Sequence, residues 1–86
     1  MTNTVTKEQI EAILSQSKHY DAKLGTKTTA VTVVLPNGFE ITETSACVDP
    51  ANYSHDIGVS ICKKRLVDRL WMLEGYALQN KLAGVA

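Results

Sequence analysis

The amino-acid sequence predicts an α+β fold, with a short N-terminal helix, a small antiparallel β-meander of two or three strands, and a long C-terminal helix. Three observations lead to this prediction: a helix-capping pattern near the start, β-branched residues around a turn signal in the middle, and an apolar stripe at helical spacing in the last third. The 86 residues are enough for one domain, 1–86, with an ordered core over about 6–82.

The first helix is predicted by its capping residues. Thr6 and Gln9 have the spacing of a capping box, in which each side chain accepts from the backbone N–H of the other residue, and Val5 and Ile10 occupy the staple positions. The helix should end near Ser17. Its apolar stripe comprises Ile10, Ile13 and Leu14.

A β-hairpin is predicted in the middle of the chain. Residues 28–35 are rich in β-branched side chains and alternate, and the sequence Leu35-Pro36-Asn37-Gly38 suits a type I turn followed by a bulge. The returning strand, residues 39–44, should place Phe39 and Ile41 on the valine face. Residues 19–24 alternate weakly and are interpreted as a short edge strand.

A long helix is predicted from His55 to about Leu82, capped by Asn52 or Ser54. No proline interrupts the pattern, but Gly58 and Gly75 permit close packing, a bend, or a break near Gly75. The apolar stripe comprises Ile57, Ile61, Cys62, Leu66, Leu70, Leu73, Ala77 and Leu78, widened by Trp71 and Leu82.

This helix is too long for the domain that carries it. It would span roughly 40 Å, whereas a compact chain of this size is about 30 Å across. An apolar stripe that continues past the domain usually marks an interface, so the sequence predicts a homodimer or a higher homo-oligomer. The predicted self-association residues are Leu70, Trp71, Leu73, Ala77, Leu78 and Leu82.

Composition excludes several classes of partner. Nine basic and nine acidic residues give a net charge of zero and a pI near 6.7, which argues against broad electrostatic capture of nucleic acid or of an anionic membrane. No apolar run is long enough for a membrane span. The opening residues lack the pattern of a signal peptide, so we expect a cytoplasmic protein.

No catalytic, metal or cofactor motif is found. Cys47 and Cys62 lack the close spacing of zinc ligands and are expected to be free thiols in a reducing compartment. Cys47, Asp49 and His55 would need to meet in one pocket for nucleophilic catalysis, but Asp49 is more simply explained as a turn residue. The sequence therefore predicts a protein that is not an enzyme and needs no cofactor.

A basic segment offers an alternative binding site. Lys63, Lys64, Arg65 and Arg69 lie within seven helical positions and can dock on phosphates or on an acidic partner. Lys63 and Arg65 project roughly 160° apart on a helix, so this is a broad face rather than a narrow stripe. A solubilising surface opposite the core remains the simpler interpretation.

The order of three motifs resembles a known family. These are LPNGF at 35–39, SACVDPANY at 45–53 and WxxEGY at 71–76. They resemble the small tailed-phage proteins grouped as the gene 49 product/gene 66 product family, found in phages and prophages. The resemblance implies a protein that acts in the cytoplasm of an infected bacterium, and it supplies no catalytic residue to carry over.

Together these observations predict a small non-enzymatic phage accessory protein that acts by binding to a host protein as a homo-oligomer. The alternative is nucleic-acid or nucleotide binding through the basic segment of the C-terminal helix.

Overall fold

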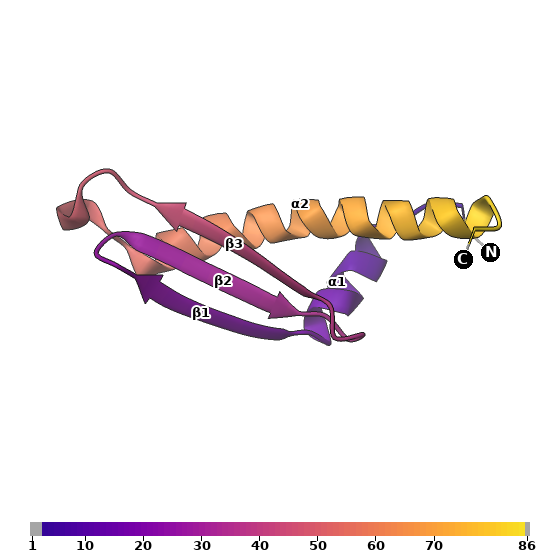
Figure 1. Ribbon diagram of the computed structural model, residues 1–86, viewed down its shortest axis with the longest axis horizontal. Helices are drawn as coiled ribbons and strands as arrows, with labels where there is room; N and C mark the ends of the chain where they lie inside the picture. The colour runs from indigo at the N-terminus through magenta and orange to yellow at the C-terminus, as the bar shows by residue number, and fades with distance from the viewer. Residues whose placement is uncertain (1–2, 86) are drawn as a thin grey trace.

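A computed structural model describes residues 3–85 and confirms the predicted α+β fold (Figure 1). Within these residues, two α-helices flank a three-stranded antiparallel sheet in chain order, and a 3-10 turn precedes the second helix. The elements are α1 (Lys7–Ser15), β1 (Lys18–Leu24), β2 (Thr28–Val34), β3 (Glu40–Ala46), η1 (Pro50–Asn52) and α2 (His55–Leu82).

The capping box of α1 forms as predicted. The Gln9 amide donates to Thr6 Oγ1 at 3.2 Å, and the Thr6 amide donates to Gln9 Oε1 at 2.7 Å. The helix ends at Ser15, two residues before the predicted end. The Ser17 hydroxyl donates to the carbonyl of Ile13, and the chain turns directly into β1.

The predicted hairpin is confirmed, including its turn. The Gly38 amide donates to the Leu35 carbonyl at 2.8 Å, and Gly38 has a φ of +91°, which favours glycine. Ile41 pairs with Val33 and is buried, as predicted. Phe39 differs: it stands before the first residue of β3 and stays 53% exposed, because it lies beyond the end of the sheet.

The core lies between one face of the sheet and α2. Residues of β2 alternate, so that Thr29, Val31 and Val33 are buried against the helix while their neighbours are only partly covered. Thr29 is the buried polar residue of this face. The core cluster comprises Ile10, Val31, Val33, Leu35, Ile41, Cys62, Leu66 and Leu70.

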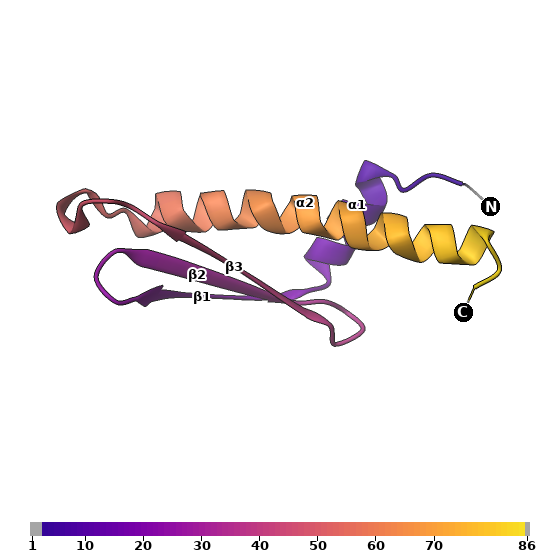
Figure 2. The same ribbon diagram turned by 45° about the horizontal axis from the view of Figure 1, so that its top comes forward.

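Helix α2 runs unbroken through Gly75, so of the three alternatives a break is excluded, while Gly58 packs closely against Thr29. Ser54 is its N-cap and accepts a hydrogen bond from the Ile57 amide at 3.3 Å. The molecule measures 51 × 21 × 20 Å, and its radius of gyration of 15.4 Å exceeds the ~12 Å of a compact chain of this length. The predicted overhang is therefore real, and Figures 1 and 2 show α2 continuing past the sheet.

Candidate functional site

The part of α2 that lies past its last buried residue, Leu70, is the candidate functional site. We call residues 71–82 the projecting segment. Sheet residues cover the helix up to this point, and α1 lies against one side of the segment (Figure 2). The segment continues as regular helix although none of the three strands described lies beneath it.

Large apolar side chains of the projecting segment are open to solvent. Met72 is 68% exposed and Tyr76 is 69% exposed, while Trp71 and Leu82 are also exposed. Met72 and Tyr76 are four residues apart and share one side of the helix. Trp71 and Leu82 lie on another side, within about 20° of each other at 100° per residue. Two separate sides of the segment are therefore apolar.

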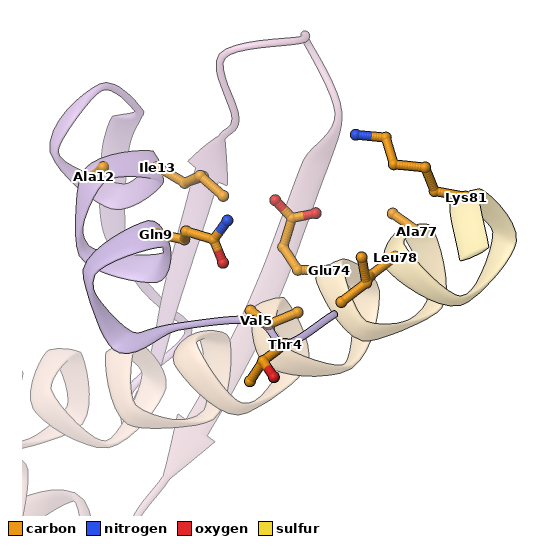
Figure 3. Close-up of a pocket in the computed structure, with 9 residues that line it drawn as sticks. All are labelled: Thr4, Val5, Gln9, Ala12, Ile13, Glu74, Ala77, Leu78 and Lys81. Atoms are coloured by element: carbon orange, nitrogen blue, oxygen red, sulfur yellow. The ribbon is translucent and has the colours of Figure 1, made fainter. Parts of the chain in front are cut away.

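A hollow of about 470 Å³ lies between the projecting segment and α1 (Figure 3). Apolar side chains from both helices face it, and the Glu74 carboxylate and the Lys81 ammonium group add charge from the α2 side. It is lined by Thr4, Val5, Gln9, Ala12, Ile13, Glu74, Ala77, Leu78 and Lys81. The capping box of α1 shapes this site, because it fixes the residues that precede the helix.

A second hollow, of about 370 Å³, lies where α1 and α2 meet the β2–β3 turn. It is lined by Ile13, Leu35, Pro36, Asn37, Phe39, Leu70, Leu73, Glu74 and Ala77. Ile13, Glu74 and Ala77 line both hollows, so the two hollows adjoin each other on the surface. The exposed Phe39 ring therefore lies beside the projecting segment.

The structure places the predicted self-association residues in different environments. Leu70 is only 2% exposed and packs against the sheet, so its side chain is not available to a second copy. Its position in the stripe does not distinguish core from interface. Leu73 packs partly on the core, whereas Ala77 and Leu78 line the hollows. Trp71 and Leu82 are exposed, as an interface requires.

The four predicted basic residues differ in their contacts. Arg65 Nη1 donates to the Thr44 carbonyl at 2.8 Å, and Arg69 Nη1 donates to the Thr42 carbonyl at 3.0 Å. Arg69 also pairs with the Glu43 carboxylate at 3.0 Å. Both arginines thus lie along the edge of β3, while Lys63 and Lys64 are exposed elsewhere on the helix.

A polar network that the sequence does not reveal lies at the other end of α2. Tyr53 OH is 2.9 Å from Thr29 Oγ1 and 2.8 Å from His55 Nδ1, and His55 Nε2 is 2.7 Å from Asp21 Oδ1. The Lys23 ammonium group lies 4.7 Å from the centre of the Tyr53 ring. These bonds join β1 and β2 to the start of α2 across 24 to 34 residues of sequence, so no local pattern signals them.

The residues considered for nucleophilic chemistry are engaged separately. Cys47 Sγ donates to the Asp49 carbonyl at 3.2 Å, whereas both ring nitrogens of His55 contact Tyr53 and Asp21. Cys62 is buried, and this burial raises the pKa of its thiol. Within residues 3–85, no group of three His, Cys, Asp or Glu residues is placed to hold a metal ion.

The described part of the chain contains no helix long and apolar enough to cross a membrane. Searches of curated proteins and of solved structures find no match. The sequence model of the family described as "Phage protein (N4 Gp49/phage Sf6 gene 66) family" matches residues 5–82, from the start of the α1 cap to the end of α2. This match confirms the resemblance seen in the three motifs, and the chain belongs to the N4 Gp49/phage Sf6 gene 66 family of phage proteins.

Proposed function

We propose that this phage protein is a non-enzymatic accessory protein that acts by binding a host protein, as a homo-oligomer, in the cytoplasm of the infected bacterium. The projecting segment of α2 is the proposed contact surface for the host protein. One observation carries the proposal: α2 extends past its own core and holds Trp71, Met72, Tyr76 and Leu82 exposed to solvent.

The residue types of this surface favour a protein as the partner. Aromatic residues and methionine are enriched at protein interfaces, and large exposed apolar patches on small proteins usually mark binding sites. Tyr76 and Trp71 are each suited to the role of an anchor, on their own side of the segment. The hollow beside α1 lies on a further side of the segment, roughly opposite Tyr76 at 100° per residue. It can accept an apolar side chain of the partner, and Glu74 and Lys81 can pair with polar groups around it.

The alternative, nucleic-acid or nucleotide binding, has weaker structural support than protein binding. Two of its four cations, Arg65 and Arg69, already donate to β3 carbonyl groups. Lys63 and Lys64 are left as the exposed pair, within a chain of zero net charge. Sequence-independent binding to a phosphate backbone requires several such cations acting together.

Site-specific photo-crosslinking in infected cells tests the proposed function. A benzophenone-bearing aromatic residue replaces Tyr76, and the matched control places the same residue at Ser60, which is exposed on α2 outside the projecting segment. We expect the probe at Tyr76 to yield a covalent adduct heavier than the protein's own dimer, identified as one host protein by mass spectrometry. Equal adducts at Tyr76 and Ser60, or no adduct at Tyr76, would contradict the proposal.

A further inference from the structure

We infer that two copies of this chain join along the outer edge of β1, forming a continuous six-stranded antiparallel sheet with Ala22 on the two-fold axis. This inference rests on the homo-oligomer proposed above and names its surface. It uses a different part of the molecule from the projecting segment, so either proposal can fail while the other stands.

The outer edge of β1 is open. The strand order is β1-β2-β3, so β1 has a hydrogen-bonded neighbour on one side only. All seven residues of β1 are exposed, and α2 packs on β2 and β3 rather than over β1 (Figure 2). A regular seven-residue edge strand presents unpaired N–H and C=O groups that readily accept another strand.

The opposite edge of the sheet is closed. Arg65 and Arg69 reach across from α2 and donate to the carbonyl groups of Thr44 and Thr42, respectively. A strand approaching β3 would have to displace both guanidinium groups and the Arg69–Glu43 ion pair. Sheet extension is therefore directed to β1.

Charge determines the register of the pairing. A two-fold axis perpendicular to the sheet keeps each face on its own side, so one residue must lie opposite its own copy. With Ala22 at that position, Asp21 of each copy lies opposite Lys23 of the other, and Tyr20 lies opposite Leu24. Opposite charges directly across an antiparallel pair stabilise it, and like charges destabilise it.

The neighbouring registers lack this complementarity. Centring the pair on Asp21 sets two carboxylates opposite each other, and centring it on Lys23 sets two ammonium groups together. Centring it on Tyr20 leaves Leu24 with no strand residue opposite. Of these registers, the one centred on Ala22 pairs opposite charges on one face of the strand and apolar side chains on the other.

The side chains involved lie on the faces that this contact requires, with the Lys23 ammonium group over the Tyr53 ring of its own chain. Asp21 and Lys23 pair with Val31 and Thr29 of β2, which face α2, so their charges share that side of the sheet. His55 contacts Oδ1 of Asp21, and the carboxylate has a second oxygen for Lys23 of the other copy. Tyr20 and Leu24 lie on the opposite face, each more than half exposed, and pairing would cover both.

A charge exchange tests the register. Wild-type protein is expected to show twice the 9.4 kDa mass of one chain by light scattering. Asp21→Lys alone and Lys23→Asp alone should each remain folded by circular dichroism and fall to the mass of one chain, because like charges then face each other. An equal mixture of the two variants should recover the doubled mass, since each introduced residue meets an opposite charge.

A wild-type protein of single-chain mass would overturn the inference, as would single variants that stay dimeric or a mixture that stays monomeric. Loss of the dimer in Leu82→Glu but not in the two charge variants would also overturn it, because the contact would then lie on α2.

Cysteine crosslinking gives a second test that leaves the charges in place. In a Cys47→Ser background, Ala22→Cys should form a disulfide-linked dimer on mild oxidation, since opposite residues of an antiparallel pair have Cα atoms about 4.5–5.5 Å apart. The matched control is Lys18→Cys, also exposed on β1. In the proposed register its two copies lie eight residues apart along the strands, about 26 Å. Crosslinking that is equal at both positions would overturn the register.

Discussion

Two glycines of α2 have similar helical backbones but opposite surroundings. A Cβ atom built on Gly58 would lie 2.7 Å from the Cβ of buried Thr29, whereas one on Gly75 meets nothing within 4 Å. Alanine is favoured over glycine in a helix by about 1 kcal/mol. Gly75→Ala is therefore expected to raise the free energy of unfolding by about that amount. Gly58→Ala should lower it by about 1–3 kcal/mol, because the core is overpacked.

Urea unfolding of both variants at one fixed protein concentration measures this difference. Fixed concentration matters because the proposed dimerisation would make the apparent stability depend on protein concentration. Two alanine variants that shift the midpoint in the same direction would show that the close approach of Gly58 to Thr29 is unimportant.

The two cysteines are expected to differ in reactivity. Burial raises the pKa of the Cys62 thiol, the nearby Arg65 charge partly opposes this by lowering the pKa, and Glu43 raises it further. Cys62 should therefore stay a protonated thiol in the folded protein, while partly exposed Cys47 reacts with a thiol reagent at neutral pH. We expect one thiol to react quickly with the reagent in buffer, and both thiols to react quickly when the protein is unfolded in urea. Cys47→Ser removes the fast phase, and equal rates for the two thiols would contradict the assignment.

The same raised pKa fixes the sign of a pH effect on stability. Below the ordinary pKa of a thiol, Cys62 is protonated in both the folded and the unfolded chain, so it does not make the free energy of unfolding depend on pH. As pH rises above that value, the unfolded chain releases the proton first, and the free energy of unfolding falls until the raised pKa of the folded state is passed. Replacing Cys62 with alanine should remove this contribution to the alkaline loss of stability.

At the scale of elements, Tyr53 joins the start of α2 to the sheet. Its hydroxyl group is the hydrogen-bond partner of the buried Thr29 hydroxyl and of His55. Tyr53→Phe should lower the free energy of unfolding by about 1–3 kcal/mol, because a buried polar group loses its partner. The double variant Thr29→Val/Tyr53→Phe should be less destabilised than the sum of the two single variants. Strictly additive effects in urea unfolding would contradict the coupling.

Elements with local signals could be predicted from the sequence. The Thr6–Gln9 capping box, the Pro36–Gly38 turn and the Ser54 cap each depend on residues within a few positions, and each forms. The end of α1 is displaced by two residues because helix ends lack a strong stop signal here. Phe39 keeps the predicted alternation but lies beyond the end of the sheet, which alternation alone does not specify.

Contacts between distant elements could not be predicted in the same way. In the sequence, Arg65 and Arg69 indicate a solvated basic face of the helix. Only the structure shows that β3 lies beside them and that they donate to its carbonyl groups. Leu70 fits the apolar stripe equally well as core or interface, and only the position of the sheet assigns it to the core. Asp21 and His55 are 34 residues apart and are brought together by the pairing of β1 with β2 and the packing of α2 on the sheet.

At the scale of the whole molecule, the two proposed surfaces lie far apart along α2. Asp21 contacts His55, the first residue of α2, so a two-fold axis at Ala22 lies close to the start of that helix. The 28 residues of α2 then lead away from the axis for about 42 Å in each copy. Because the axis reverses the direction of the second helix, the two projecting segments point to opposite ends of the dimer.

This arrangement predicts the shape of the dimer in solution. Small-angle X-ray scattering of the wild-type dimer should give a maximum dimension of roughly 80 Å or more, well beyond the 51 Å of one chain, since two α2 helices extend in opposite directions. The equal mixture of Asp21→Lys and Lys23→Asp should give the same curve, and each variant alone the curve of one chain. A dimer whose α2 helices pair side by side and in parallel would bury the projecting segments against each other and remain close to 51 Å long. The extended form leaves both segments accessible, so one dimer could hold two copies of a partner and gain avidity from their linkage.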